Sequence, residues 1–167
     1  VCHTPVSGID IFPTAMDYAG VRPSKYKVDG ADIRPLLEGR KIKDRPLFWH
    51  YPHYGNQGGE PSSIIREGDW KLIFYHEDGH YELYNLAEDL GETRPLNAEY
   101  PKKLEALKRK LHRWLEETHA VMPVPDPTYS AEKEAAYRAR SNARILKSQE
   151  NLRQNMMKRD WSPNATW

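Results

Sequence analysis

The sequence contains little cysteine and no long apolar run. Cys2 is the one cysteine among 167 residues, so an internal disulfide is impossible and cysteine carries no information about the compartment. No apolar stretch reaches the ~20 residues that a membrane-spanning helix needs, and no signal-peptide pattern opens the chain. Charge of either sign is also not in excess, with 25 Lys and Arg against 24 Asp and Glu, which argues against a nucleic-acid or membrane binder. The composition is that of a domain with a modest core.

The first twenty residues predict a short helix. The chain begins abruptly, and a strong pattern follows within a few residues, which is typical of a piece of a longer protein. Ser7 can cap a helix over 7–19, Pro13 must either kink it or lie in its first turn, and Gly20 ends it. One face of this helix is apolar and requires a partner surface: Ile9, Phe12, Met16 and Ala19.

Four short segments have strand character: 47–51, 62–66, 70–75 and 81–86. Gly68-Asp69 separates the second from the third, and Glu77-Asp-Gly79 separates the third from the fourth. Such turns between short β-prone segments are typical of hairpins. The pattern therefore predicts a small antiparallel sheet.

Residues 101–118 form the strongest helical pattern. Pro101 suits a first helical position, and the apolar stripe consists of Leu104, Leu107, Leu111, Trp114 and Leu115. Antiparallel strands followed by a covering helix predict an α+β fold.

The chain changes character after residue 120. Residues 121–128 are rich in proline and should be extended, and 131–160 predict a weaker helix. That segment has 8 Lys and Arg against 4 Asp and Glu, so it is locally basic. It is either a solvated helix or one that binds a partner or an anionic surface.

Five stretches together resemble the formylglycine-dependent (type I) sulfatases of the alkaline-phosphatase superfamily. They occur in the family's order and cover about residues 4–127: Pro5-Val-Ser-Gly-Ile-Asp-Ile-Phe-Pro-Thr14 with Asp17-Tyr-Ala-Gly20, Val28-Asp-Gly30 leading to Pro35-Leu-Leu-Glu-Gly39, Arg45-Pro-Leu-Phe-Trp-His-Tyr-Pro-His53, Ile64-Ile-Arg-Glu-Gly-Asp-Trp-Lys-Leu-Ile73, and Glu82-Leu-Tyr-Asn-Leu86 with Asp89-Leu-Gly-Glu92. Each stretch is mostly structural, and it is the ordered set that is specific.

The resemblance implies a C-terminal subdomain with a four-stranded antiparallel sheet packed against a long helix. Residues 1–40 then correspond to the end of the large α/β domain, 41–120 to the subdomain, and 121–167 to a connector and basic tail. In the family the helix at 7–19 packs on the large domain. Without that domain, two copies of this chain could form a homodimer through the apolar face of this helix. The resemblance also implies an upstream catalytic domain as partner, a sulfated glycan or aryl sulfate as substrate, and export to the periplasm, exterior or lysosome.

The catalytic chemistry of such an enzyme is not expected within these residues. The family uses a formylglycine, made from Cys or Ser in a C/S-x-P/A-x-R motif, together with a divalent cation that is usually calcium. Cys2 is followed by His-Thr-Pro-Val, which does not match this motif. We therefore expect no catalytic residue, metal ligand or cofactor in this chain and assign Ca²⁺ and the formylglycine to the parent enzyme.

Substrate recognition could remain at the end of the first strand. Tyrosine rings stack on sugars, and imidazoles and amides donate hydrogen bonds to sulfate oxygens and hydroxyls. The expected substrate-binding residues are His50, Tyr51, His53, Tyr54, Asn56 and Gln57. In the resembling family this region faces the active-site cleft. The alternative is that Trp49 and Tyr51 belong to the sheet core and that His50 bonds to the backbone.

Other roles for the conspicuous polar residues are simpler. Lys71 alternates with apolar neighbours and is expected on a solvent-facing side of its strand, while Asp89 and Glu92 are expected to stabilise a turn. Two alternative functions stay open: a stand-alone carbohydrate- or protein-binding module, and a piece of a related phosphodiesterase or phosphonate hydrolase.

Overall fold

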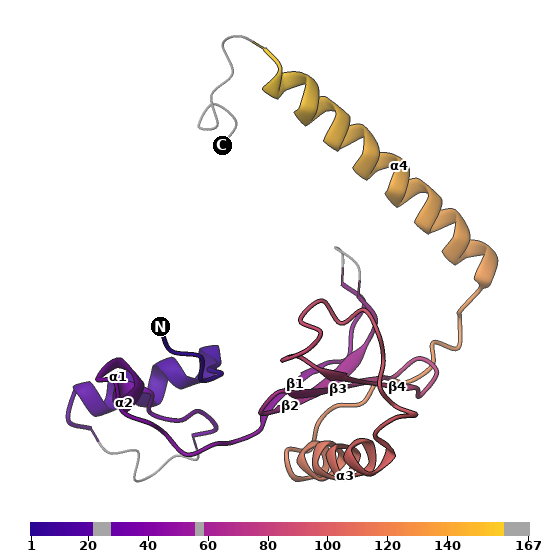
Figure 1. The fold of residues 1–167 in the computed structure, drawn as a ribbon. Coiled ribbons are helices and arrows are strands. Elements are labelled where there is room, and N and C mark those ends of the chain that lie inside the picture. Colours follow the sequence, from indigo (N-terminus) through magenta and orange to yellow (C-terminus); the bar gives the residue numbers. More distant parts are fainter. Residues whose placement is uncertain (22–27, 56–58, 159–167) are drawn as a thin grey trace. The chain divides into compact units, whose positions relative to one another are not determined.

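The computed structural model describes residues 1–21, 28–55 and 59–158 (Figure 1). The chain divides into two compact units, Val1–Pro123 and Val124–Trp167, which are considered separately. None of the helices in the described part of the chain combines the length and the apolar character needed to span a bilayer.

The predicted helix near the N-terminus is present in two pieces. A 3₁₀ turn, η1 (Gly8–Asp10), leads into α1 (Ile11–Tyr18), and Pro13 lies in the first turn of α1, where its missing N–H costs no hydrogen bond. The buried side of η1 and α1 includes two polar residues, Asp10 and Thr14, which are 0 % and 7 % exposed, together with Pro13. Ile9 and Phe12 of the expected apolar stripe are 49 % and 60 % exposed, whereas Met16 is half-buried, so the stripe is only partly covered within the described residues.

Asp10 joins the N-terminal helix to the segment that follows it. Its carboxylate accepts hydrogen bonds from the backbone N–H of Ser7 at 2.8 Å and of Ala31 at 2.9 Å, and it forms an ion pair with Arg45. Burial alone raises the pKa of this carboxyl, but the hydrogen bonds from Ala31 and Ser7 and the Arg45 guanidinium outweigh it and leave the pKa below its ordinary value. Asp10 therefore stays ionised and stabilises this part of the chain.

The short helix α2 (Arg34–Leu37) is followed by Gly39, whose positive φ of 75° stops the helix from continuing. Thr14 holds its start in place, because the Thr14 hydroxyl accepts a hydrogen bond from the backbone N–H of Ile33 at 3.0 Å.

The sheet is an antiparallel meander in the order β1-β2-β3-β4. Its strands are β1 (Leu47–Tyr51), β2 (Ser62–Glu67), β3 (Trp70–Tyr75) and β4 (Tyr81–Asn85), which confirms the four predicted strands to within one residue at each end. Gly68 and Gly79 both have positive φ in the two tight turns, as the hairpin pattern predicts.

The long helix α3 (Pro101–Glu117) covers one face of the sheet (Figure 1). Its stripe meets the inward residues of the strands in one core: Ile65, Leu72, Leu83, Leu107, Leu111 and Leu115. The ring of Phe48 stacks on Trp114 with centroids 4.8 Å apart. A sheet covered by a helix confirms the α+β prediction. Burial of these side chains contributes roughly 1.5–3 kcal/mol each to stability, so α3 is the main stabilising partner of the sheet.

The opposite face of the sheet is less exposed to solvent than expected at Lys71. Lys71 was predicted to face solvent, but its side chain is only 20 % exposed and its Nζ lies 2.6 Å from both carboxylate oxygens of Glu92. The loop after β4 folds back over this face and supplies the carboxylate. Asp89 stabilises that loop as predicted, because it accepts hydrogen bonds from the backbone N–H groups of Thr93 and Arg94.

The second unit contains a single helix within the described residues, α4 (Ala131–Met156). The Ser130 side chain caps it by accepting from the backbone N–H of Lys133. None of its described side chains is buried, which agrees with the weak apolar pattern of this segment.

Candidate functional site

The predicted site residues that the structure describes lie at the end of β1, where Pro52 ends the strand. Tyr51 and Tyr54 are 55 % and 58 % exposed, and His53 is exposed as well. The ring of Tyr51 meets the edge of His53 with centroids 5.4 Å apart. Asn56 and Gln57 lie outside the described residues. The strand end therefore presents one aromatic ring and one imidazole side by side on the surface.

Strand alternation separates these residues into two faces. Phe48 and His50 point toward α3, whereas Trp49 and Tyr51 point to the other face, because side chains alternate along a strand. Trp49 is 40 % exposed, so neither it nor Tyr51 belongs to the core. β1 is an edge strand, and its outer aromatic residues are accessible to a ligand.

His50 is engaged within the chain through both ring nitrogens. Its Nε2 lies 2.9 Å from the backbone oxygen of Val121, and its Nδ1 lies 2.7 Å from the hydroxyl of Ser63. Ser63 is fully buried, and its hydroxyl also lies 2.9 Å from Nε2 of His76. The three side chains form a continuous chain of hydrogen bonds between β1, β2 and the end of β3.

The partners fix the tautomers of this chain. The Val121 oxygen can only accept, so His50 carries its proton on Nε2 and, when neutral, accepts at Nδ1 from the Ser63 hydroxyl. The Ser63 oxygen then accepts from His76 Nε2. All three hydrogen bonds of the chain can therefore form when both imidazoles are neutral. Burial, followed by the positive charges that His50 and His112 would carry, lowers the pKa of His76 below its ordinary value.

A second polar cluster lies on the outer face beside Tyr51. The hydroxyls of Tyr75 and Tyr84 both donate to one carboxylate oxygen of Glu82, at 2.9 and 3.0 Å. Burial and the Glu82 charge raise the pKa of Tyr75 to about 12. Tyr51 and Tyr75 are both paired with Ser62 in the register, so their side chains lie on one face about 10 Å apart.

Sequence reasoning missed Ser63, His76 and Glu82 as members of these clusters. Two features of the sequence pointed toward these clusters. Ser63 is a polar residue on the same inward face of its strand as Ile65, and Glu82 and Tyr84 lie two residues apart on the outer face of β4. Neither identifies its partners, which lie on other strands.

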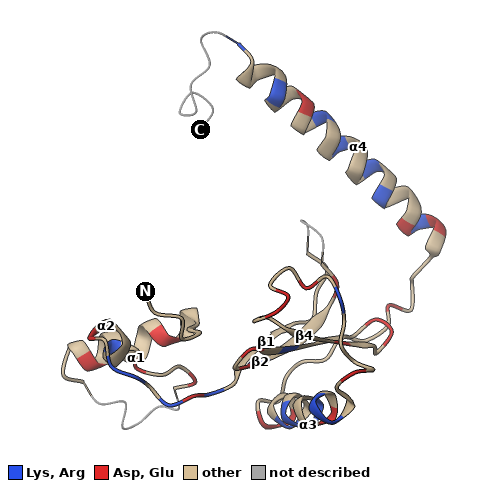
Figure 2. Ribbon diagram, in the orientation of Figure 1, with Lys and Arg blue, Asp and Glu red and all other residues tan. Residues whose placement is uncertain are grey.

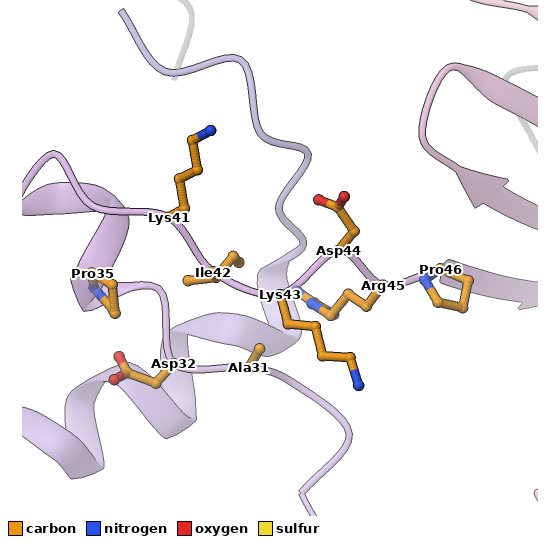
Figure 3. Close-up of a pocket in the computed structure, with 9 residues that line it drawn as sticks. All are labelled: Ala31, Asp32, Pro35, Lys41, Ile42, Lys43, Asp44, Arg45 and Pro46. Atoms are coloured by element: carbon orange, nitrogen blue, oxygen red, sulfur yellow. The ribbon is translucent and has the colours of Figure 1, made fainter.

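A hollow of about 620 Å³ lies in the segment before β1 (Figure 3). Its lining residues are Ala31, Asp32, Pro35, Lys41, Ile42, Lys43, Asp44, Arg45 and Pro46. The Lys41 and Lys43 side chains point away from each other in Figure 3, and Arg45 is paired with Asp10. The charged groups do not converge, so this hollow is not a good candidate for an anion site.

Metal-ligating residues do not gather in the described part of the chain. Among residues 1–21, 28–55 and 59–158 no three His, Cys, Asp or Glu side chains come close enough to hold a metal ion together. Cys2 is exposed, and hydrogen bonds with the backbone and side chain of Thr4 lower the pKa of its thiol. These described residues do not fit a calcium site.

Comparison with known families gives a match that includes the sheet and α3. Residues 2–121 match the family model described as N-sulphoglucosamine sulphohydrolase, C-terminal. A sulfatase from Formosa agariphila is 39 % identical over 131 residues, which cover 69 % of this chain and 24 % of that protein.

Two solved structures are similar to most of this chain. One was solved in complex with its substrate D-glucosamine-2-N,6-O-disulfate and is 33 % identical, with a TM-score of 0.51, covering 65 % of this chain and 23 % of the other. The other, a 2-O GAG sulfatase, is 26 % identical, with a TM-score of 0.54, covering 71 % of this chain and 27 % of the other. The chain thus spans about a quarter of the length of these relatives.

Proposed function

The chain belongs to the family of N-sulphoglucosamine sulphohydrolase C-terminal domains, and from this we propose that it is the C-terminal part of a longer sulfatase. The single observation that carries the proposal is the family match over 2–121, which includes the predicted strands and α3. Of the two solved structures described above, one holds a sulfated glucosamine as its substrate and the other is a 2-O GAG sulfatase. We therefore propose a sulfated carbohydrate as substrate and hydrolysis of its sulfate ester as the reaction.

The nucleophile and the metal are assigned to the upstream part of the enzyme. The described residues hold no suitable cluster of metal ligands, and Cys2 lies outside any C/S-x-P/A-x-R motif. A divalent cation such as calcium neutralises sulfate oxygens where it is bound, and a formylglycine supplies the nucleophile. We propose that both come from the catalytic domain, and that the enzyme is exported, as sulfatases commonly are.

The end of β1 is the proposed contribution of this chain to the substrate pocket. Tyr51, His53 and Tyr54 are exposed there, so a ring face and an imidazole are available for a sugar and a sulfate group. The same proposal includes Asn56 and Gln57, which lie outside the described residues. His50 has both ring nitrogens occupied by Ser63 and Val121, and we assign it a positioning role that fixes the strand end from which these side chains project.

The apolar face of η1 and α1 is the proposed contact with the catalytic domain. Ile9, Ile11 and Phe12 are all at least 49 % exposed, and exposed apolar residues that are contiguous favour an interface. This chain by itself is expected to dimerise through that face. Light scattering that finds a monomer at all concentrations would contradict dimerisation, and replacing Phe12 by Ser would lower the dimer fraction if it forms.

Sulfate release by the complete enzyme tests the proposed function. The complete protein should release sulfate from a sulfated oligosaccharide or an aryl sulfate, and this 167-residue chain alone should release none. His53→Ala in the complete enzyme should raise KM or lower kcat about tenfold or more, and His3→Ala, at an exposed position near the N-terminus, serves as the control. Turnover by the chain alone would contradict the assignment of the chemistry. Hydrolysis of a phosphonate or phosphodiester in place of the sulfate ester would favour the related hydrolase.

A further inference from the structure

A row of basic side chains runs along α4, in the unit that the family match does not include. Lys and Arg recur along this helix in Figure 2. Five residues follow one another at alternating intervals of four and three: Lys133, Tyr137, Arg140, Arg144 and Lys147. At 3.6 residues per turn they fall within about 80° of arc and extend over ~21 Å, so they form one straight stripe. We refer to these five residues as the basic stripe.

The charges of the basic stripe are not neutralised within the described residues. Arg138 and Arg153 lie off the stripe and pair with Glu134 and Glu150. Among residues 1–21, 28–55 and 59–158 no ion pair involves any of the four basic members of the stripe, and all five members are exposed. The acidic residues of α4 lie on other sides of the helix.

The stripe destabilises the isolated helix. Arg140 and Arg144 are one turn apart, and so are Arg144 and Lys147, and like charges at these spacings cost a few tenths of a kcal/mol per pair. A ligand with regularly spaced negative charges would remove this repulsion. Guanidinium groups also form paired hydrogen bonds with tetrahedral oxyanions, which adds to the charge complementarity.

We propose that the basic stripe binds the sulfated polysaccharide chain on which the enzyme acts, at a distance from the bond that is hydrolysed. This rests on the proposed function, which makes a sulfated carbohydrate the substrate. Single-stranded nucleic acids are bound through several stacking aromatic residues, and the stripe has only Tyr137. Anionic membranes select helices with a broad apolar face, whereas the larger apolar residues of α4 are sparse: Ile145, Leu146, Leu152 and Met156. A straight polyanion in water is the better match.

Binding of a heparin oligosaccharide of defined length to the full 167-residue chain tests this proposal. The variant Arg140→Gln/Arg144→Gln/Lys147→Gln should bind at least tenfold more weakly at low salt. Its plot of log affinity against log salt should be less steep by about two, because fewer counterions are released on binding. The charge-matched control Arg138→Gln/Arg153→Gln/Lys158→Gln should change affinity by no more than about threefold. Circular dichroism confirms that α4 is retained in both variants.

Several results would overturn the proposal. Equal losses in the two variants would show a response to net charge and not to the stripe. Equal binding of desulfated heparin, of poly(U) RNA or of phosphatidylserine vesicles would remove the assignment to sulfated glycans. If the chain dimerised through the Ile145 side of α4 and did not bind heparin, the partner of α4 would be a second copy of this chain and not a glycan.

Kinetics of the complete enzyme separate this proposal from the proposed function. The stripe variant should raise KM for a polymeric substrate and leave turnover of a sulfated monosaccharide unchanged, whereas His53→Ala should affect both substrates. An enzyme without sulfatase activity whose stripe still binds heparin would refute the proposed function alone. An active enzyme whose stripe variant behaves as the wild type toward the polymer would refute the stripe alone.

Discussion

His50 donates a hydrogen bond from Nε2 to the backbone oxygen of Val121, 71 residues further along the chain, over 2.9 Å. The bond ties the edge strand β1 to the segment that leaves α3. Because Nδ1 of the same ring is bound to Ser63, the imidazole cannot rotate without breaking both contacts. The proposed substrate-binding end of β1 is therefore fixed by residues that are distant in the sequence.

Ser63→Ala should destabilise the sheet. The substitution removes the hydroxyl between His50 and His76 and leaves two imidazole nitrogens without a partner, which costs about 1–3 kcal/mol. Urea unfolding followed by tryptophan fluorescence measures the loss. Ser62→Ala, one residue earlier and on the opposite face of β2, is the control and should change the free energy of unfolding by less than about 0.5 kcal/mol. Equal effects would show that the hydrogen-bond chain contributes nothing.

The stability of the sheet should fall as the pH is lowered below about 6.5. His76 has an ordinary pKa of 6.5 when unfolded and a lower pKa when folded, because burial and the neighbouring His50 and His112 disfavour its charged form. In the interval between the folded pKa and 6.5 the unfolded chain binds more protons, so stability is complete above 6.5 and is lost as the pH falls through this interval. His76→Gln should make the free energy of unfolding less dependent on pH between 7.5 and 5. An unchanged slope would contradict the assignment.

Gly30→Ala should open the N-terminal segment. A Cβ at residue 30 would lie 2.1 Å from the backbone oxygen of Ile9, so the two backbone segments would have to separate. Overpacking of this kind costs about 1–3 kcal/mol or more. Faster hydrogen exchange of the Ala31 amide, which donates to Asp10, would report the opening. Gly8→Ala is the matched control, because nothing lies within 4 Å of a Cβ there, and its exchange rates should stay close to those of the wild type.

Asp10→Asn should weaken the same segment by a different route. The substitution leaves the Arg45 guanidinium without its carboxylate, and removal of one partner from a buried ion pair costs about 3 kcal/mol. Asp17→Asn is the control, since the Asp17–Arg34 pair is exposed and should contribute less than about 1 kcal/mol. Thermolysin cleavage within residues 1–45 should accelerate in the first variant and not in the second. Similar rates in both variants would show that the Asp10–Arg45 pair is dispensable.

The sequence by itself determined the elements, because their signals are local. Alternating strand residues and the two glycine turns defined β2, β3 and β4, and the leucine stripe defined α3. The ordered stretches between Pro5 and Glu92 also established the family resemblance. The exposed position of His53 after Pro52 was open to prediction from the same local reasoning, and its role in binding stays a prediction.

Only the tertiary structure decided which polar groups meet. The chain from His76 through Ser63 to His50, the Lys71–Glu92 pair and the Asp10–Arg45 pair each join residues from separate elements. Strand register places His50 opposite Ser63, whereas the two ion pairs form where segments outside the strands fold back on their neighbours. Both depend on how whole segments pack. The expectation that Lys71 faces solvent was wrong for this reason, since alternation gives the face of a strand but not what covers it.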